Sequence, residues 1–174
     1  MAVAALVSLE EYLSTSYHPD CEFVEGRLVE RNVGEFNHSF LQVAFTLALN
    51  ALGLRTYTEL RCQVKVRRYR IPDVLALAPG QKRGRRYQKT APYIVVEILS
   101  PDDRVSDLRD KLDDYFAAGV PNIWVVDPEA RGLTVYRERE THTFTKLVTT
   151  SDGAVSLDLA DIFRRMAEDE DEAE

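Results

Sequence analysis

A single acidic residue inside an apolar run is the feature that most restricts how this chain can fold. The run extends from Tyr93 to Leu99, carries Glu97 as its one charged residue, and is bounded by Pro92 and by Ser100-Pro101. A short run of this kind, rich in β-branched residues, predicts a buried strand rather than a helix. Because a buried carboxylate is costly without a partner, we expect a cation beside Glu97.

The segment that follows the strand offers such a cation. A helix is predicted from about Ser106 to Ala118, ended by Gly119. Asp107, Lys111 and Tyr115 are spaced four residues apart and therefore share one helix face. Lys111 can aim its amine back toward the strand, or it can be a solvated lysine with a partner one turn away; the spacing is compatible with both.

A second acid precedes another apolar segment, Asp73 to Ala78. Pro72 cannot donate a ladder hydrogen bond, so Asp73 is predicted to be the first residue of this strand. If the two strands are neighbours, Asp73 and Glu97 form a site of hard oxygen ligands that suits a magnesium-type ion. The alternative is two unrelated acids at the ends of separate strands.

These residues resemble the Uma2 family of the PD-(D/E)xK nuclease superfamily. The resemblance is carried by Pro72-Asp73, Glu97-Ile98-Leu99-Ser100-Pro101, Asp107 and Lys111. It covers about Ser8 to Phe163 and implies the restriction-endonuclease-like fold, an α/β fold with a mixed central β-sheet flanked by helices. The superfamily lysine should stand at position 99, where this chain has Leu99. The resemblance therefore implies that Lys111 takes its role.

The resemblance also implies further site residues. Glu22, in a predicted hairpin of Cys21 to Val24 and Arg27 to Glu30, would reach the metal directly or through water; it could equally be an exposed strand residue. His38 would face the site, or be a plain capping or surface histidine. The predicted metal ligands for Mg²⁺ (or Mn²⁺) are Asp73, Glu97, Glu22 and the Ile98 carbonyl. The predicted supporting residues are Asp107, which would hold Lys111, together with His38 and Tyr115.

A basic stretch offers a surface for the DNA backbone. It places five cations within eight residues, namely Lys82, Arg83, Arg85, Arg86 and Lys89. Such a stretch in a mobile loop beside a metal site is what phosphate-backbone binding requires. The alternative is an ordinary solvated loop.

The remaining pattern predicts a regular succession of elements. Ser8 and Glu11 form a capping box for a short first helix, and a core helix, apolar nearly all round, is predicted from Asn37, its possible N-cap, to Leu52. The last predicted helix runs from Leu159 to Met166. Further strands are predicted near Arg55 to Glu59, Gln63 to Arg67, Asn122 to Asp127, Leu133 to Glu138 and Thr143 to Val148.

Composition limits the class of protein. The length of 174 residues suits one domain, predicted over residues 1–166, and the net charge of −7 falls to −1 without the six acids in the last seven residues. Residues 167–174 are therefore predicted to form a disordered acidic tail. No apolar run approaches the roughly 18 residues of a membrane span, and Cys21 and Cys62 lack CxxC spacing, so a cytoplasmic location is the default.

The predicted function is hydrolysis of DNA phosphodiesters by a metal-dependent endonuclease, with a homodimer as the expected assembly. Lys111 would orient the attacking water or stabilise charge on phosphorus. One alternative is a nucleic-acid-binding or assembly module that keeps the fold without turnover. Another is a metal-dependent hydrolase of small phosphoesters, which would not need the basic stretch.

Overall fold

The computed structural model describes residues 6–31, 34–101, 103–137 and 140–172. The helices are α1 (Leu9–Ser14), α2 (Phe36–Ala51), α3 (Val105–Ala118) and α4 (Leu159–Asp171). The strands are β1 (Cys21–Val24), β2 (Arg27–Glu30), β3 (Arg55–Thr58), β4 (Cys62–Lys65), β5 (Arg68–Arg70), β6 (Val74–Leu77), β7 (Ile94–Ile98), β8 (Asn122–Asp127), β9 (Gly132–Arg137), β10 (Glu140–Phe144), β11 (Leu147–Thr149) and β12 (Ser156–Asp158).

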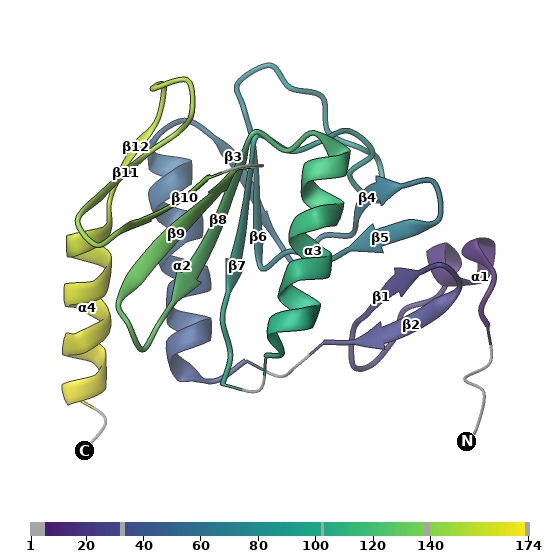
Figure 1. Ribbon diagram of the computed structural model, residues 1–174, viewed down its shortest axis with the longest axis horizontal. Helices are drawn as coiled ribbons and strands as arrows, with labels where there is room; N and C mark the ends of the chain where they lie inside the picture. Colours follow the sequence, from purple (N-terminus) through teal and green to yellow (C-terminus); the bar gives the residue numbers. More distant parts are fainter. Residues whose placement is uncertain (1–5, 32–33, 102, 138–139, 173–174) are drawn as a thin grey trace.

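A mixed sheet forms the centre of the molecule (Figure 1). Within the described residues it has six strands in the order β10-β9-β8-β7-β6-β3, with β7 and β8 parallel and the other neighbours antiparallel. Helices α2 and α4 cover one face and α3 covers the other. A smaller sheet, β2-β1-β5-β4, lies beside α3. The predicted α/β class with a mixed central sheet flanked by helices is confirmed.

The alternation of side chains along β7 decides where Glu97 points. Ile94, Val96 and Ile98 belong to the core cluster under α2 and α4, whereas Val95 packs in the cluster under α3. Because successive side chains of a strand point to opposite faces, Glu97 shares the face of Val95. The acid is therefore directed toward α3.

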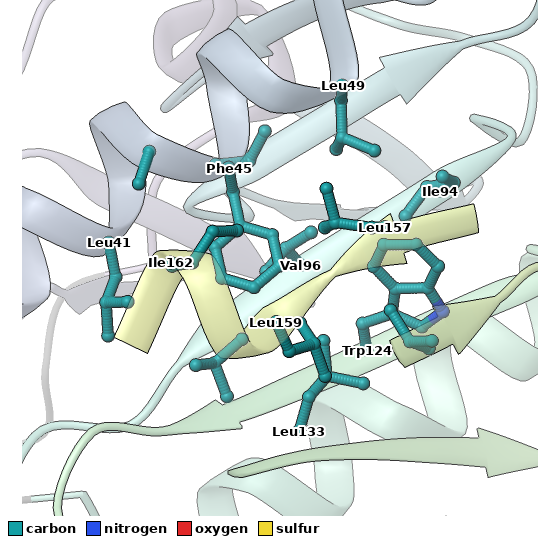
Figure 2. Close-up of a cluster of buried hydrophobic side chains, with 14 of the residues drawn as sticks. Leu41, Phe45, Leu49, Ile94, Val96, Trp124, Leu133, Leu157, Leu159 and Ile162 are labelled. Carbon is teal, nitrogen blue, oxygen red and sulfur yellow. The ribbon is translucent and has the colours of Figure 1, made fainter. Parts of the chain in front are cut away.

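The larger core cluster joins α2 and α4 to the sheet (Figure 2). Trp124 of β8 is fully buried there, as predicted, and Phe45 of α2 packs with it in the same cluster. Helix α2 is not buried all round, however, because Phe36, Val43 and Leu47 are exposed. The prediction of a core helix is confirmed, since α2 packs Leu41, Phe45 and Leu49 in the cluster shared with the sheet and α4, although another apolar face of the helix stays uncovered.

Other differences concern short elements and helix ends. Strands β5 and β12 have three residues each and were too short to give a pattern, and the strand predicted at Thr143 to Val148 is the separate β10 and β11. The N-cap of α2 is Glu35, not Asn37. Asn37 lies inside the helix and donates to Glu170 of α4. Within the described residues, no helix is long and apolar enough to cross a membrane.

The acidic C-terminal segment is helical further than predicted. Helix α4 continues past Met166 to Asp171, so the prediction of disorder from residue 167 is wrong for residues 167–171. An intrahelical ion pair between Arg164 and Glu168, together with contacts of Glu170 to Asn37 and Arg131, accounts for the extra turns. Residues 173–174 lie outside the described residues.

Candidate active site

Asp73 and Glu97 lie side by side on neighbouring strands. Val74 pairs with Val96 in the antiparallel β6–β7 ladder, and the same register places Asp73, one residue before β6, opposite Glu97. Asp73 Oδ2 accepts the backbone N–H of Ile98 at 2.7 Å. Both carboxylates are buried, with 3% and 4% of their surfaces exposed. The alternative of two unrelated acids does not describe this geometry.

Helix α3 provides two direct partners of Glu97. Lys111 Nζ lies 2.8 Å from Glu97 Oε2, and the Tyr115 hydroxyl donates to Glu97 Oε1. Burial raises the pKa of Glu97, and the nearby Asp73 adds to this, while Lys111 opposes it. Burial disfavours the charged form of Lys111, but Glu97, Glu22 and Asp73 outweigh it and raise the lysine pKa. Lys111 is thus a charged partner of a buried acid and not a solvated lysine.

Asp73 is surrounded by three donors from separate parts of the chain. Besides the Ile98 N–H, Arg31 Nη2 contacts Oδ1 and His38 Nε2 lies 3.4 Å from Oδ2. Burial opposes ionisation of Asp73, but His38 and Arg31 outweigh it and lower its pKa. Burial lowers the pKa of His38, but its hydrogen bond with Asp73 and the charge of Asp73 outweigh burial, so the pKa of His38 is raised. Arg31 was not predicted, and no spacing in the sequence links it to Asp73.

Glu22 is buried, with 2% of its surface exposed, so its interpretation as an exposed strand residue is wrong. Arg70 Nη1 donates to its Oε2 at 2.7 Å, and the Ile71 N–H donates to its Oε1 at 3.0 Å. The other side of the Arg70 guanidinium contacts Asp114 of α3 at 2.7 Å. Glu22 Oε1 also lies 4.0 Å from Lys111 Nζ. The buried Arg70 therefore ties β1 and β5 to the helix that carries Lys111.

Sequence reasoning missed Arg70 and Asp114, although both had a signal. Arg70 precedes the Ile71-Pro72-Asp73 segment, and Asp114 follows Lys111 by three residues, which places it on the same side of α3. A charged residue on the buried side of an amphipathic helix needs a partner of opposite charge. That argument was applied to Glu97 and holds equally for Asp114.

A cleft of about 230 Å³ opens onto these side chains. Among the described residues, seven carboxylates line it, against three arginine or lysine side chains and His38. The acids of the cleft outnumber its cations, so its electrostatic potential favours a bound cation over a bare phosphate. The charged residues that line it are Glu22, Glu30, Arg31, His38, Arg70, Asp73, Glu97, Asp103, Asp107, Asp110 and Lys111.

The donor chemistry of the cleft fits a hard divalent cation at Asp73 and Glu97. Their carboxylate oxygens are the ligands that Mg²⁺ prefers. Burial raises the pKa of Glu97, Lys111 lowers it, and the neighbouring Asp73 and Glu22 raise it further. Glu22 fits less well, because its partners are the Ile71 N–H and the buried Arg70, whereas Asp73 Oδ1 and Glu97 Oε2 contact the partly exposed side chains of Arg31 and Lys111. Across residues 6–31, 34–101, 103–137 and 140–172, no three His, Cys, Asp or Glu side chains form a metal site by themselves. A main-chain ligand such as the Ile98 carbonyl, or water, would have to complete the coordination.

Two predicted contributors do not make the predicted contacts. The basic stretch belongs to the connection between β6 and β7, which joins the strand ends opposite to those that carry Asp73 and Glu97 (Figure 1). None of its five cations lines the cleft, so the expectation that it lies beside the site is wrong. Asp107 lines the cleft, but its described contact is with the Ser106 hydroxyl, while Lys111 contacts Glu97 and Glu22.

An acid pair on adjacent strands, a lysine from the following helix and a mixed sheet between helices define a restriction-endonuclease-like fold. The chain belongs to the Uma2 family, whose model, described as "Putative restriction endonuclease", matches residues 9–168.

One solved structure shares the fold. A crystal structure from Anabaena variabilis ATCC 29413, described as "a putative nuclease belonging to DUF820", is similar with a TM-score of 0.78 and 24% identity over 92% of this chain and 99% of that chain. A cryo-EM structure of a DrdV–DNA complex has a TM-score of 0.40 and 18% identity over 74% of this chain and 11% of that chain, too low a score to indicate a shared fold. No curated protein matches the sequence.

Proposed function

We propose that this protein is a divalent-cation-dependent endonuclease that hydrolyses phosphodiester bonds in DNA. The observation that carries the proposal is the placement of Asp73 opposite Glu97, with the Lys111 amine 2.8 Å from the latter carboxylate. The family description supports a nuclease, and the excess of acids in the cleft supports a cation that neutralises them before a phosphate enters.

Asp73, Glu97 and the Ile98 carbonyl would hold Mg²⁺ or Mn²⁺, which supplies a Lewis acid for the phosphate and lowers the pKa of a bound water. Lys111 stays protonated at neutral pH because three carboxylates raise its pKa. Its amine can therefore donate to the attacking water or to the charge that develops on phosphorus. Tyr115 donates to Glu97 Oε1 and fixes the orientation of that carboxylate.

We assign Glu22 to the positioning of Lys111 rather than to the cation. Its carboxylate is fixed by Arg70 and by the Ile71 N–H, and it presents Oε1 at 4.0 Å from the lysine amine. The negative charge of Glu22 also contributes to the raised pKa of Lys111.

The buried, unpaired thiols of Cys21 and Cys62 suit a reducing compartment such as the cytoplasm.

Calorimetric titration with Mg²⁺ or Mn²⁺ tests the cation site. The wild type should bind the cation and the double variant Asp73→Ala/Glu97→Ala should not. The matched control is Asp161→Ala/Glu168→Ala, which removes two exposed acids of α4 outside the cleft and should bind as the wild type does. Equal binding by wild type and Asp73→Ala/Glu97→Ala would mean that the paired acids are structural.

The reaction itself is tested with Lys111→Met on plasmid, single-stranded and branched DNA. We expect cleavage to be lost while cation binding is retained, because Lys111 contacts the reacting atoms and not the cation. Normal cleavage by this variant would refute the role of Lys111. Cation binding without cleavage of any DNA by the wild type would favour the hydrolase of small phosphoesters, which the distance of the basic stretch from the cleft also favours. Neither binding nor cleavage would favour a non-catalytic module.

A further inference from the structure

The two oxygens of the Asp73 carboxylate are held in different ways. Oδ2 accepts the Ile98 N–H at 2.7 Å, a main-chain donor fixed by strand β7, and lies 3.4 Å from His38 Nε2. Among the described residues, the partner of Oδ1 is Arg31 Nη2, at the end of a long side chain. A cation that binds Asp73 must therefore compete with Arg31 for Oδ1.

We propose that Arg31 binds the phosphate of the substrate, and that a divalent cation at Asp73 releases Arg31 for this purpose. The inference rests on the proposed function, because it requires a cation at Asp73. It assigns Arg31 a role that neither the motifs nor the family description gives it.

Arg31 has the freedom that this exchange requires. It follows the last residue of β2, lines the cleft, and leaves 14% of its side chain exposed. Arg31 Nη1 also lies 3.6 Å from Glu59 Oε1, whose side chain is half exposed. A guanidinium that leaves Asp73 therefore keeps a neighbouring acid and stays at the wall of the cleft.

The other arginine that lines the cleft within the described residues, Arg70, does not have this freedom. Arg70 is 6% exposed and contacts two buried carboxylates, Glu22 and Asp114, on opposite sides of its guanidinium. Moving Arg70 would break its ion pairs with two buried acids at once, which is strongly unfavourable. Arg31, by contrast, leaves Asp73 when another cation takes its place, so the charge of Asp73 remains compensated.

The chemistry of a guanidinium suits the second half of the exchange. Its planar set of N–H donors binds carboxylate and phosphate oxygens with the same geometry. Cation binding would thus convert an Asp73–Arg31 pair into an Asp73–cation pair and an Arg31–phosphate pair. The affinities for cation and DNA are then coupled, each ligand raising the affinity for the other.

Cation affinity without DNA tests the first half. Titration calorimetry with Mn²⁺ should show roughly 3- to 10-fold tighter binding by Arg31→Met than by wild type, since the competitor for Oδ1 is gone. Arg27→Met is the matched control, because Arg27 is an exposed arginine of β2, the strand that Arg31 follows, and lies outside the cleft; the affinity of this variant should equal that of wild type. A purely structural role of Arg31 would weaken cation binding when Arg31 is removed.

DNA affinity tests the second half. Fluorescence anisotropy with a short duplex, in a Lys111→Met background that does not cut, should show that Mn²⁺ tightens binding about 10-fold or more and that Arg31→Met removes this gain. Arg31→Lys keeps the positive charge but lacks the planar set of N–H donors, and it should restore part of the Mn²⁺-dependent gain in DNA affinity. Circular dichroism of each variant identifies any that does not fold; if Arg31→Met does not fold, Arg31→Gln, which also removes the charge, carries the comparison.

The outcomes separate this inference from the proposed function. If Asp73→Ala binds Mn²⁺ as tightly as wild type, the cation site is wrong and both fail. If Asp73→Ala loses Mn²⁺ but Arg31→Met, or Arg31→Gln where Arg31→Met does not fold, binds Mn²⁺ no tighter than wild type, the Arg31 inference alone is overturned. A gain in DNA affinity with Mn²⁺ that survives in Arg31→Met overturns it as well.

Discussion

Removal of Arg70 tests how far the buried ion pairs hold the site and the small sheet together. The arginine is 6% exposed, and the carboxylates of Glu22 and Asp114 that it joins are 2% and 0% exposed. Each contact is 2.7 Å long. Arg70→Met keeps the aliphatic bulk of the side chain and removes its donors, so the change isolates the polar contacts from packing.

The size of the effect follows from what remains in place. Breaking one partner of a buried ion pair costs about 3–5 kcal/mol. Glu22 keeps the Ile71 N–H, and Asp114 keeps Lys65 and Arg68 at 3.0 and 2.9 Å, so we expect the lower end of that range. A loss of about 3 kcal/mol corresponds to a decrease in Tm of roughly 6–12 °C for a chain of this length.

Urea unfolding followed by circular dichroism measures the change. The matched control is Arg164→Met, since Arg164 also pairs with two carboxylates, both at 2.5 Å, but on the exposed surface of α4. We expect no resolved change for this control. A loss below about 1 kcal/mol for Arg70→Met, the range of surface pairs, would refute the reasoning. The double variant Glu22→Gln/Arg70→Met should lose less than the sum of the single changes, because the two residues interact directly.

Three further predictions concern other parts of the chain. The pKa of His38 is raised, so its pairing with Asp73 stabilises the protein fully below pH 6.5 and less as the pH rises through the folded-state pKa. The difference in unfolding free energy between wild type and His38→Gln should therefore shrink as the pH rises. A difference that stays constant with pH would contradict this prediction. Neutralising the five cations of residues 82–89 should leave Mg²⁺ affinity unchanged, because they lie outside the cleft, and calorimetry checks this. Gly119→Ala should cost about 1 kcal/mol in urea unfolding, since Gly119 caps α3 with a φ of 80° and a Cβ would meet no atom within 4 Å, so strain alone acts.

Local patterns predicted the elements whose signals are complete within a few residues. The hairpin turn at Glu25-Gly26, where both residues have positive φ, was read from the sequence, and β1, β2 and β8 have the predicted bounds. Helix α3 begins one residue earlier than predicted and ends where Gly119 predicted. Short strands such as β5 were missed, because three residues give too little alternation and their strand geometry depends on the neighbours β1 and β4.

Sequence reasoning predicted the Glu97–Lys111 part of the site, because a charged residue in an apolar strand requires a partner. A carboxylate in an apolar strand demanded a cation, and the spacing on α3 offered Lys111. Arg31 and His38 come to Asp73 from the end of β2 and the first turn of α2, distant in sequence from β6. No periodicity connects such residues, so sequence reasoning could name His38 only through a family resemblance and could not name Arg31.

The sequence by itself determined that Glu97 is buried in a strand and that a helix with Lys111 follows, because these follow from hydrophobicity and helix spacing over adjacent residues. Tertiary structure decided which oxygens face which donors. The register of β6 and β7 sets Asp73 opposite Glu97, and the connection between these two strands carries the basic stretch to their opposite ends. The pairing of β1 with β5 sets Glu22 and Arg70 beside α3. Such contacts depend on strand pairing over long sequence separations, which no local pattern encodes.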